Sequence, residues 1–297
     1  MVRLGIDLGG TKIELIALDA SGSQLLRQRV ATPQGDYAGI VDTVAGLVEA
    51  AERALGRAAS IGIGTPGAIS PATGLMKNSN SVCLNGRPLK QDIEARLGRS
   101  IALANDANCF ALSEATDGAA AGAEVVFGVI IGTGCGAGIV VRGQVLSGPN
   151  AIAGEWGHNP LPWPQAEELP GPECYCGRHG CLETWISGTG LARDFSARGG
   201  PARAAVEIAE FATRGDAASE TALQRYEDRL ARGLAHVINL LDPDAIVLGG
   251  GMSNLGRLYD NVPRLWGRYV FSDAVSTRLL PPRHGDSSGV RGAAWLR

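Results

Sequence analysis

Two stretches of the chain share one pattern: residues 6–13 read IDLGGTKI, and residues 130–139 read IIGTGCGAGI. In each, an apolar strand ends in a turn rich in glycine, and a second apolar segment follows. Because glycine has no Cβ, such a turn exposes backbone N–H groups that can bind phosphate oxygens. One hairpin of this kind in each half of the chain predicts two lobes that hold one nucleotide triphosphate between them.

The first hairpin contains a carboxylate, Asp7, at the end of an otherwise apolar strand. A carboxylate in such surroundings needs a partner, and a magnesium ion or its water ligands would serve. The alternative is an ordinary glycine turn without a ligand.

The second hairpin also matches the dinucleotide-binding pattern G-x-G-x-x-G/A, through Gly132, Thr133, Gly134 and Ala137. That pattern binds a dinucleotide only where it opens a helix. Here it leads into the β-like segment 137–141, so a nicotinamide site is not expected.

Periodicity and turn residues predict an α/β protein. We expect strands at 2–7, 13–18, 25–30, 60–64, 101–104, 125–131, 137–141 and 245–248, with a further strand after the turn at 142–143. We expect helices at 36–55, 90–97, 108–117, 221–241 and 288–296, and another after the glycine run at 249–251. Residues 159–182 are rich in proline, glycine and cysteine, so no regular structure is expected there.

The composition excludes several classes of protein. Of the 297 residues, 45% are apolar and 19% are charged, and the net charge of −3 gives no surface for nucleic acid or anionic membranes. There is no Gly-Lys dipeptide, so a Walker-type P-loop is absent. Without a signal peptide or a long apolar run, we expect a cytoplasmic protein whose six cysteines form no disulfide framework.

Asn105 and Asp106 follow a predicted strand and precede a predicted helix. One interpretation is helix capping, because Asn and Asp are preferred N-cap residues. The other is a general base, because α/β sheets bind ligands at the carboxyl ends of their strands and phosphoryl transfer to an alcohol uses a carboxylate that accepts the proton. The residues alone leave both open.

A third glycine cluster, Gly249, Gly250 and Gly251, follows a buried strand. It could pack against an adenine ring and its ribose. A plain connection from strand to helix explains it equally well.

Cys174, Cys176 and Cys181 form a C-x-C-x4-C pattern in the proline-rich segment. Three thiolates and one imidazole make a closed, structural zinc site, with His158 or His179 as the fourth ligand. Two carboxylates, Glu155 and Glu183, are close in sequence to these ligands. We expect them to accept hydrogen bonds from sugar hydroxyls, although solvated loop charges are the alternative.

Taken together, these motifs resemble the ROK family (repressors, open reading frames, kinases) over essentially the whole chain. The motifs that carry the resemblance are DLGGTK at 7–12, ANDAN at 104–108, IGTGCGAG at 131–138, GEWGH at 154–158, CYCGRHGCLE at 174–183 and GGG at 249–251. The segments KNSNS at 77–81, LNG at 84–86 and HGDSSGVRGAAWL at 284–296 look most like the bacterial fructokinase (mannokinase) branch.

The resemblance implies an actin-like ATPase (ribonuclease H-like) fold, with two lobes and a cleft between them. The small lobe would comprise residues 1–107 and 284–297, and the large lobe residues 108–283. ATP and Mg²⁺ would lie in the cleft, and the cofactor-binding residues would be Asp7, Gly9, Gly10, Thr11, Lys12, Gly132, Thr133, Gly134, Gly136, Gly249, Gly250 and Gly251.

The same resemblance assigns roles to the polar residues. It makes Asp106 the general base, and it makes Asn105, Glu155, His158 and Glu183 contacts to the sugar. It also implies a structural Zn²⁺ held by His158, Cys174, Cys176 and Cys181.

These assignments predict an ATP-dependent kinase that phosphorylates the 6-hydroxyl of a free hexose, with fructose expected first and mannose second. A glucokinase, an N-acetylhexosamine kinase and a sugar-sensing regulator without catalysis are the alternatives. Gly67, in the turn at 65–67, and the segment 78–80 are candidates for reading sugar carbons 1 and 2. A DNA-binding repressor is not expected, because the chain starts directly at the first phosphate strand. A homodimer is the family-level expectation.

Overall fold

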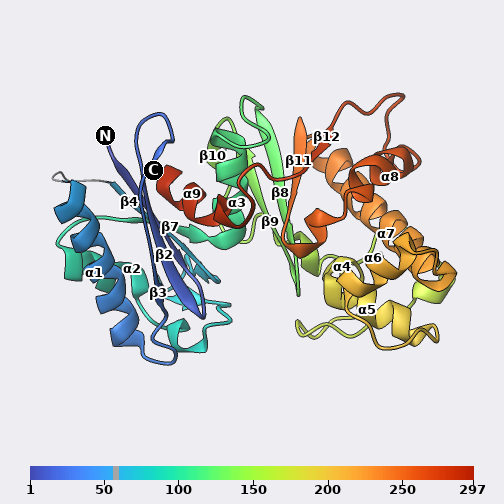
Figure 1. Ribbon diagram of the computed structural model, residues 1–297, viewed down its shortest axis with the longest axis horizontal. Helices are drawn as coiled ribbons and strands as arrows, with labels where there is room; N and C mark the ends of the chain where they lie inside the picture. Colours follow the sequence, from blue (N-terminus) through green and yellow to red (C-terminus); the bar gives the residue numbers. More distant parts are fainter. Residues whose placement is uncertain (56–59) are drawn as a thin grey trace.

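The computed structural model describes residues 1–55 and 60–297, with Asp286 described by its backbone alone. Two five-stranded sheets lie side by side, with helices on their outer faces and between them (Figure 1). The first sheet has the order β3-β2-β1-β4-β7, with β1 at Arg3–Leu8, β2 at Lys12–Leu18, β3 at Gln24–Ala31, β4 at Ser60–Thr65 and β7 at Ala102–Asn105. The second has the order β10-β9-β8-β11-β12, with β8 at Val125–Ile131, β9 at Cys135–Val141, β10 at Gln144–Val145, β11 at Ala245–Gly249 and β12 at Arg278–Leu280.

The two sheets are built to the same plan. In each, the first three strands along the chain form an antiparallel meander, and two later strands add in parallel on the other side of the first strand. The repeated hairpin in the sequence is therefore the visible part of a repeat that extends over both whole sheets. This strand order agrees with the expected actin-like ATPase fold.

Each sheet has its own core on its outer face. Helices α1 (Tyr37–Leu55) and α2 (Leu89–Leu97) cover the first sheet, where Ile40 and Val44 of α1 pack with Leu4 and Ile6 of β1 (Figure 1). Five helices form the outer layer of the second half: α4 (Leu182–Ile186), α5 (Gly188–Ala197), α6 (Ala205–Thr213), α7 (Ala217–Leu241) and α8 (Arg257–Trp266).

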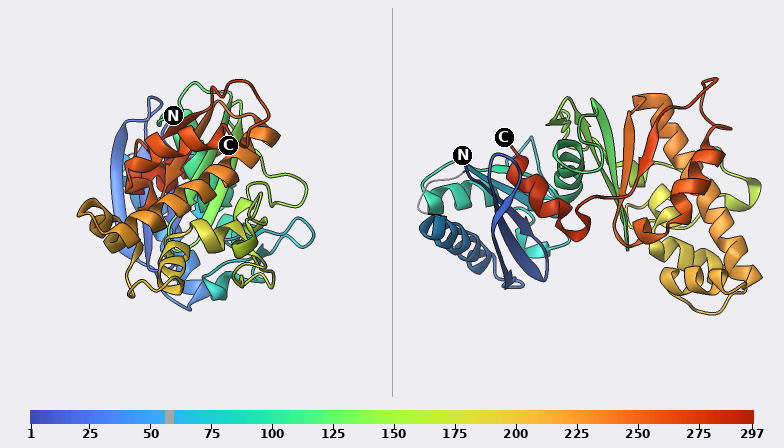
Figure 2. Two further views of the ribbon diagram at one scale, coloured as in Figure 1. Left: turned by 90° about the vertical axis from the view of Figure 1, so that its right-hand side faces the viewer. Right: turned by 45° about the horizontal axis from the view of Figure 1, so that its top comes forward.

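Two helices cross between the sheets, and each packs on the half that it does not follow in sequence (Figures 1 and 2). Helix α3 (Asp106–Thr116) follows the first sheet but packs on β8 and β9, whereas α9 (Ser288–Trp295) follows the second sheet but packs on β1 and β4. The helices also pack on each other so closely that a Cβ on Gly292 would lie 1.6 Å from the Cys109 carbonyl oxygen. Only glycine fits at such a contact.

The predicted elements are confirmed, with shifts of a few residues at their ends. The sequence did not indicate the short hairpin β5 (Ala68–Ile69) and β6 (Met76–Lys77), nor β12. Segment 159–182 is irregular except for a 3₁₀ turn at Ala166–Glu168, two isolated bridges and its last residue, Leu182, which begins α4. Within the described residues, no helix combines the length and the apolarity that a membrane crossing requires.

Candidate active site

Asp7 lies near the carboxyl end of β1, beside Gly64 of β4 and Glu14 of β2. Its pKa is raised to about 6, mainly by burial and then by the negative charges of Asp106 and Glu14, while Lys12 and Arg29 act in the opposite direction. Asp7 and Asp106 therefore lie close enough to repel each other, although 98 residues lie between them in the sequence. A site with this concentration of negative charge suits a cation.

The structure separates the roles of Asn105 and Asp106. Asn105 is the N-cap of α3, and its side-chain oxygen accepts a hydrogen bond of 2.7 Å from the Asn108 backbone N–H. Asp106 is the first residue of the helix, and its Oδ1 accepts a 2.8 Å hydrogen bond from the Ala107 N–H. The Asp106 side chain remains open to solvent, yet the surrounding protein raises its pKa by desolvation. The capping interpretation thus applies to Asn105 and leaves the carboxylate of Asp106 accessible.

The second glycine hairpin joins β8 to β9 and lies directly against the start of α3. A Cβ on Gly138 would come within 2.6 Å of the Ala107 carbonyl oxygen, and a Cβ on Gly136 within 3.5 Å of the Ala107 Cβ. The close approach at Gly138 places the hairpin next to the residue that follows Asp106. The segment after the glycines is strand β9, as expected, which removes the dinucleotide-binding interpretation.

The first glycine hairpin joins β1 to β2, and its turn residues Gly10, Thr11 and Lys12 are exposed. The Gly9 N–H donates to the Lys12 carbonyl at 3.0 Å. Thr32 fixes the turn from the neighbouring strand, because its hydroxyl donates to the Gly9 carbonyl at 2.7 Å. The sequence did not single out Thr32, since its role depends on the pairing of β2 with β3.

A cavity of about 740 Å³ opens beside the second hairpin. Its lining is largely apolar and comes from the hairpin, α5, α6 and the segment after β11, including Gly132, Thr133, Ala205, Gly251 and Met252. An apolar slot next to a turn that is expected to bind phosphate suits a purine nucleoside.

The start of α5 forms part of this cavity and was missed by the sequence analysis. The Gly188 N–H donates to the Gly132 carbonyl at 2.8 Å, and the Thr189 hydroxyl donates to the Thr133 carbonyl at 2.8 Å. These bonds fix the amino end of a helix, which attracts negative charge, beside the hairpin. The signal in the sequence was the SGTG segment at 187–190, which resembles the hairpin turns themselves.

The glycines of the third cluster have different surroundings. Only Gly251 lines the cavity. A Cβ on Gly249 would lie 2.6 Å from the Phe110 ring, and one on Gly250 would lie 2.5 Å from the Ile131 carbonyl oxygen. Gly249 and Gly250 are thus closely packed inside the second half, and a contact to the nucleotide stays a prediction for all three glycines.

Glu155 and Glu183 lie on either side of the Cys/His segment. Glu155 is exposed and precedes the 3₁₀ turn Trp156–His158. Glu183, in the first turn of α4, accepts a 2.9 Å hydrogen bond through Oε2 from the Cys135 N–H at the end of the second hairpin. Glu183 thus connects the Cys/His segment to the phosphate hairpin, a contact that the sequence did not indicate.

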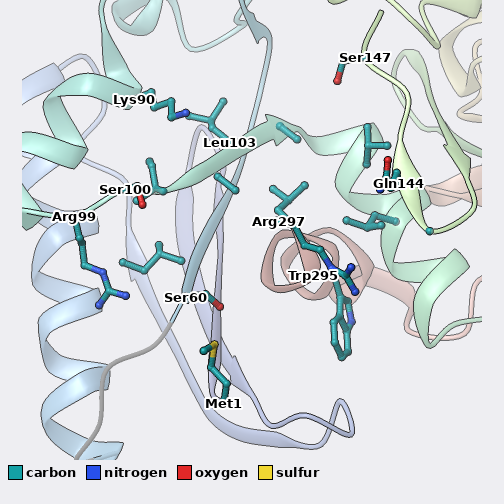
Figure 3. A pocket seen from close by; sticks show the side chains of 18 residues that line it. Met1, Ser60, Lys90, Arg99, Ser100, Leu103, Gln144, Ser147, Trp295 and Arg297 are labelled. Atoms are coloured by element: carbon teal, nitrogen blue, oxygen red, sulfur yellow. The ribbon is translucent and has the colours of Figure 1, made fainter.

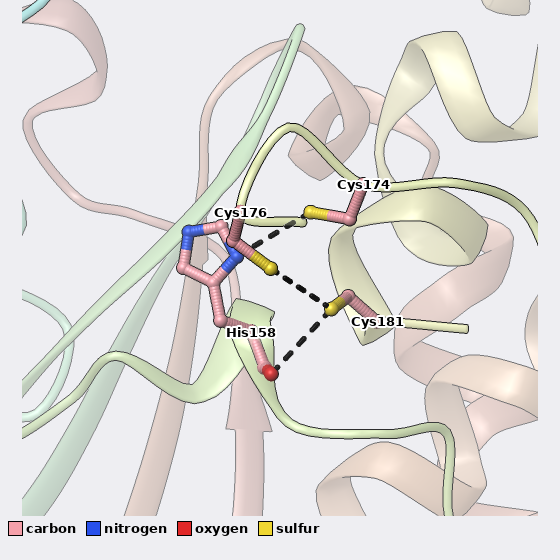
Figure 4. A group of neighbouring side chains, drawn as sticks. All are labelled: His158, Cys174, Cys176 and Cys181. Atoms are coloured by element: carbon pink, nitrogen blue, oxygen red, sulfur yellow. Dashed lines mark hydrogen bonds between the residues drawn. The ribbon is translucent and has the colours of Figure 1, made fainter. Parts of the chain in front are cut away.

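His158, Cys174, Cys176 and Cys181 bring one potential ligand atom each to within 4.8 Å of one another (Figure 4). His158 Nδ1 lies 3.6 Å from the Cys174 Sγ, and the Cys176 and Cys181 sulfur atoms lie 3.6 Å apart. His179 instead lies opposite Glu173 in an isolated bridge and is outside the group. Three thiols and one imidazole fit a closed tetrahedral zinc site. We call these four residues the Cys₃His group.

Buried charges hold the other end of the same segment. Glu168 accepts hydrogen bonds of 2.8 Å from Arg229 and Arg232 of α7, and Arg232 also donates to the Trp163 carbonyl at 2.9 Å. Burial alone would raise the Glu168 pKa, but the hydrogen bonds from Arg232 and Arg229 lower it to about 2. Segment 159–172 is therefore tied to α7 as well as to the Cys₃His group.

Gly67 packs against the end of β6, in the short hairpin β5-β6. Its φ is +80°, and a Cβ there would lie 2.5 Å from the Lys77 carbonyl oxygen. The Lys77 ammonium donates to the Asn150 carbonyl at 3.1 Å, which connects β6 to the loop before Glu155. A direct contact between Gly67 and a sugar stays a prediction.

A larger cavity, of about 980 Å³, lies elsewhere (Figure 3). It is lined by the starts of β4 and β7, at Ser60 and Ala102, and by the chain end at Arg297. Asp7 and Asn105 lie at the opposite, carboxyl ends of the strands, and no candidate site residue lines this cavity. The convergence of charged groups and glycine turns, rather than cavity size, locates the site.

Two sheets of the same order, with crossed helices between them, define the actin-like ATPase fold. The model of the ROK family matches residues 3–297, and the chain belongs to that family. The chain is 40% identical to the N-acetyl-D-glucosamine kinase of Photobacterium profundum, over 98% of each chain.

Solved structures agree with this assignment. The ROK hexokinase from Thermus thermophilus is 33% identical, with 99% of this chain and 97% of that chain covered and a TM-score of 0.87. A ROK family glucokinase from Streptomyces griseus, solved with glucose and AMPPNP, is 29% identical over 99% and 98% of the two chains, with a TM-score of 0.75.

Proposed function

We propose that the protein transfers the γ-phosphoryl group of ATP to the 6-hydroxyl group of a free hexose. The observation that carries this proposal is the meeting of three features: the Asp106 carboxylate, the second glycine hairpin packed against Ala107, and Asp7, whose pKa the nearby Asp106 charge helps to raise. In phosphoryl transfer the protein mainly positions the reactants and stabilises negative charge, and these three features supply such groups.

In this mechanism Asp106 accepts the proton of the sugar hydroxyl while the hydroxyl oxygen attacks the γ-phosphorus and ADP leaves. The backbone N–H groups of both hairpins, with Lys12, bind the phosphate oxygens, and the apolar cavity beside Thr133 receives the adenosine. Mg²⁺ held near Asp7 would neutralise charge on the phosphates. Residues 1–107 with 284–297 would move as one lobe, and residues 108–283 as the other.

Asn105, Glu155, His158 and Glu183 would orient the sugar. A zinc ion in the Cys₃His group would be structural, because four protein ligands leave no position for water. It would fix the segment that carries His158 and lies between the two glutamates. Glu183 would then couple sugar position to phosphate position through its bond to Cys135.

For the sugar, we propose N-acetyl-D-glucosamine ahead of fructose. The 40% identity over 98% of both chains is to a protein named N-acetyl-D-glucosamine kinase, and this supports the alternative substrate over the fructose that the motifs first indicated. Fructose stays a second candidate because segments 77–81 and 284–296 resemble the fructokinase branch.

The test is a panel of hexoses in a coupled assay of ADP release. Purified protein is given ATP, Mg²⁺ and N-acetyl-D-glucosamine, fructose, mannose or glucose, and kcat/KM is measured for each. We expect the highest kcat/KM with N-acetyl-D-glucosamine. A higher value with fructose would restore the fructokinase assignment, and sugar binding without ADP release would indicate a sensor rather than an enzyme.

A further inference from the structure

Tyr175 lies between two residues of the Cys₃His group in sequence and contacts a third in space. Its hydroxyl oxygen lies 2.9 Å from His158 Nε2, and the two rings meet edge to face with centroids 5.1 Å apart. The residue is nevertheless 83% exposed. Among residues 1–55 and 60–297, His158 is the one hydrogen-bond partner of this hydroxyl. Tyr175 is thus held at the site by its polar end, while most of its ring remains in solvent.

The partner of this hydroxyl, His158, is one of the side chains proposed to contact sugar hydroxyls. Two others, Glu155 and Glu183, adjoin the Cys₃His group: the His158 N–H donates to the Glu155 carbonyl at 3.4 Å, and Glu183 follows Cys181 by two residues.

His158 has one ring nitrogen available for a sugar. Nδ1 faces the sulfur of Cys174, and the other ring nitrogen points away from the cysteines (Figure 4). That nitrogen, Nε2, is already paired with Tyr175. Because an imidazole nitrogen makes one strong hydrogen bond, Nε2 cannot serve the tyrosine and a sugar hydroxyl together.

We propose that the hydroxyl of Tyr175 occupies the position of a sugar hydroxyl in the sugar-free protein and leaves His158 when the sugar binds. This inference rests on the proposed function, since it names a residue that sets the sugar affinity of the same site. Sugar binding must then break an existing hydrogen bond, so Tyr175 weakens sugar binding. The exposed ring can swing into solvent without disturbing a packed core.

The direct test is Tyr175→Phe, which removes the hydroxyl and keeps the ring. Sugar affinity is measured by calorimetry without ATP, with N-acetyl-D-glucosamine and fructose as the probes. An ordinary hydrogen bond corresponds to about a threefold to tenfold change in affinity, so we expect Kd and KM for the sugar to fall by that factor while kcat is unchanged. Tyr269→Phe is the matched control, because its hydroxyl bonds Asp228 away from the Cys₃His group, and it should keep the wild-type Kd.

Other outcomes of this test would overturn the inference. Unchanged or weaker sugar binding in Tyr175→Phe contradicts it, and so does loss of bound zinc, which would show that the hydroxyl supports the Cys₃His group. If the wild-type protein binds and phosphorylates a hexose and Tyr175→Phe behaves identically, this inference is wrong and the proposed function stands. A wild-type protein that binds none of the hexoses overturns the proposed function as well.

A second measurement follows the displacement itself. The chain has five tyrosines, so labelling with 3-fluorotyrosine gives five ¹⁹F resonances, and the one missing from Tyr175→Phe is assigned to Tyr175. We expect this resonance to shift when saturating sugar is added. A resonance that does not move would show that the hydroxyl stays on His158.

Discussion

The two sheets have the same strand order but different chemistry at their carboxyl ends. In the first sheet, β1 carries Asp7 and β7 leads directly into Asp106. In the second sheet, β8 ends in the fully buried Ile131, and β12 is followed by Pro281. Carboxylates at the strand ends of the candidate site are thus found on the first sheet, although both sheets carry a glycine hairpin.

The second half contributes surfaces instead. Its long connection between β10 and β11 holds the Cys₃His group, Glu155, Glu183 and part of the walls of the apolar cavity. A repeated frame therefore positions two unlike sets of groups: the charges proposed to act on the phosphorus, and the surfaces proposed to hold the substrates. Function follows from the residues at the strand ends and not from the shared topology.

The largest expected effect concerns the acidic residues at the strand ends of the first sheet. Asp106→Asn should lower kcat by at least about a thousandfold, because the amide cannot accept the hydroxyl proton, while sugar Kd changes little. Steady-state kinetics and calorimetry on the same preparation measure both. Turnover near the wild-type rate would remove Asp106 from the mechanism.

Asp7→Asn should lower kcat/KM by about a hundredfold, with a higher Mg²⁺ requirement, since the cation loses a carboxylate. The same substitution should make the folded protein more stable at high pH. The folded pKa of about 6 lies above the ordinary value of 3.8, so the group stabilises the fold fully only below pH 3.8 and loses this contribution as pH rises through about 6.

At pH 8 without Mg²⁺, the asparagine variant should therefore unfold with a free energy about 1–3 kcal/mol higher than that of the wild type. Denaturant titrations at pH 8 and pH 4 check this, and the difference should shrink at the lower pH. A variant that is less stable at pH 8 would show that the Asp7 carboxylate is not repelled in the folded state.

On the second half, Cys174→Ser or removal of the metal with a chelator should raise the sugar KM by about fiftyfold and leave the ATP KM within about twofold. The reason is that the Cys₃His group contains His158, a proposed sugar contact, and contributes no residue to the cavity proposed for the nucleotide. Cys83→Ser is the matched control, because Cys83 is outside the group. Equal losses for sugar and ATP would show that the segment serves the whole lobe.

The smallest effect tests the shared frame. Gly5 on β1 lies against α9, where a Cβ would be 2.2 Å from the Val290 carbonyl oxygen, and Gly128 on β8 lies against α3, where it would be 2.7 Å from the Ala111 Cα. Each change to alanine should cost about 2 kcal/mol of unfolding free energy, since backbone atoms cannot move aside cheaply. Gly46→Ala, in α1 with open space around it, should instead gain about 0.5–1 kcal/mol. A large loss at only one of the first two positions would break the equivalence of the sheets.

Much of the fold could be predicted because its signals are local. The strands β1, β2, β8 and β9 are apolar runs separated by glycine turns, and their repetition indicated two equivalent halves. The exchange of α3 and α9 could not be derived from periodicity, because a helical stripe shows that a face is buried but not against which sheet.

Some residues of the candidate site also have a local signal in the sequence, and others do not. The sequence singled out Asp7, Asp106 and the Cys₃His residues as candidates because carboxylates at strand ends and closely spaced cysteines are distinctive. The bond from Cys135 to Glu183 and the placement of Tyr175 on His158 depend on contacts between distant segments, which no local pattern encodes. Gly249 and Gly250 pack closely in the second half, and their predicted contact to the nucleotide has no separate signal, because a glycine that packs closely and a glycine that contacts a ligand look alike in a sequence.

A crystal structure of the protein with N-acetyl-D-glucosamine and a non-hydrolysable ATP analogue would test the arrangement of the reacting groups most directly. We expect the sugar 6-hydroxyl within hydrogen-bonding reach of the Asp106 carboxylate, about 2.6–3.2 Å, and facing the terminal phosphorus between the two glycine hairpins. A sugar bound with that hydroxyl turned away from Asp106, or a triphosphate that contacts neither hairpin, would contradict the account.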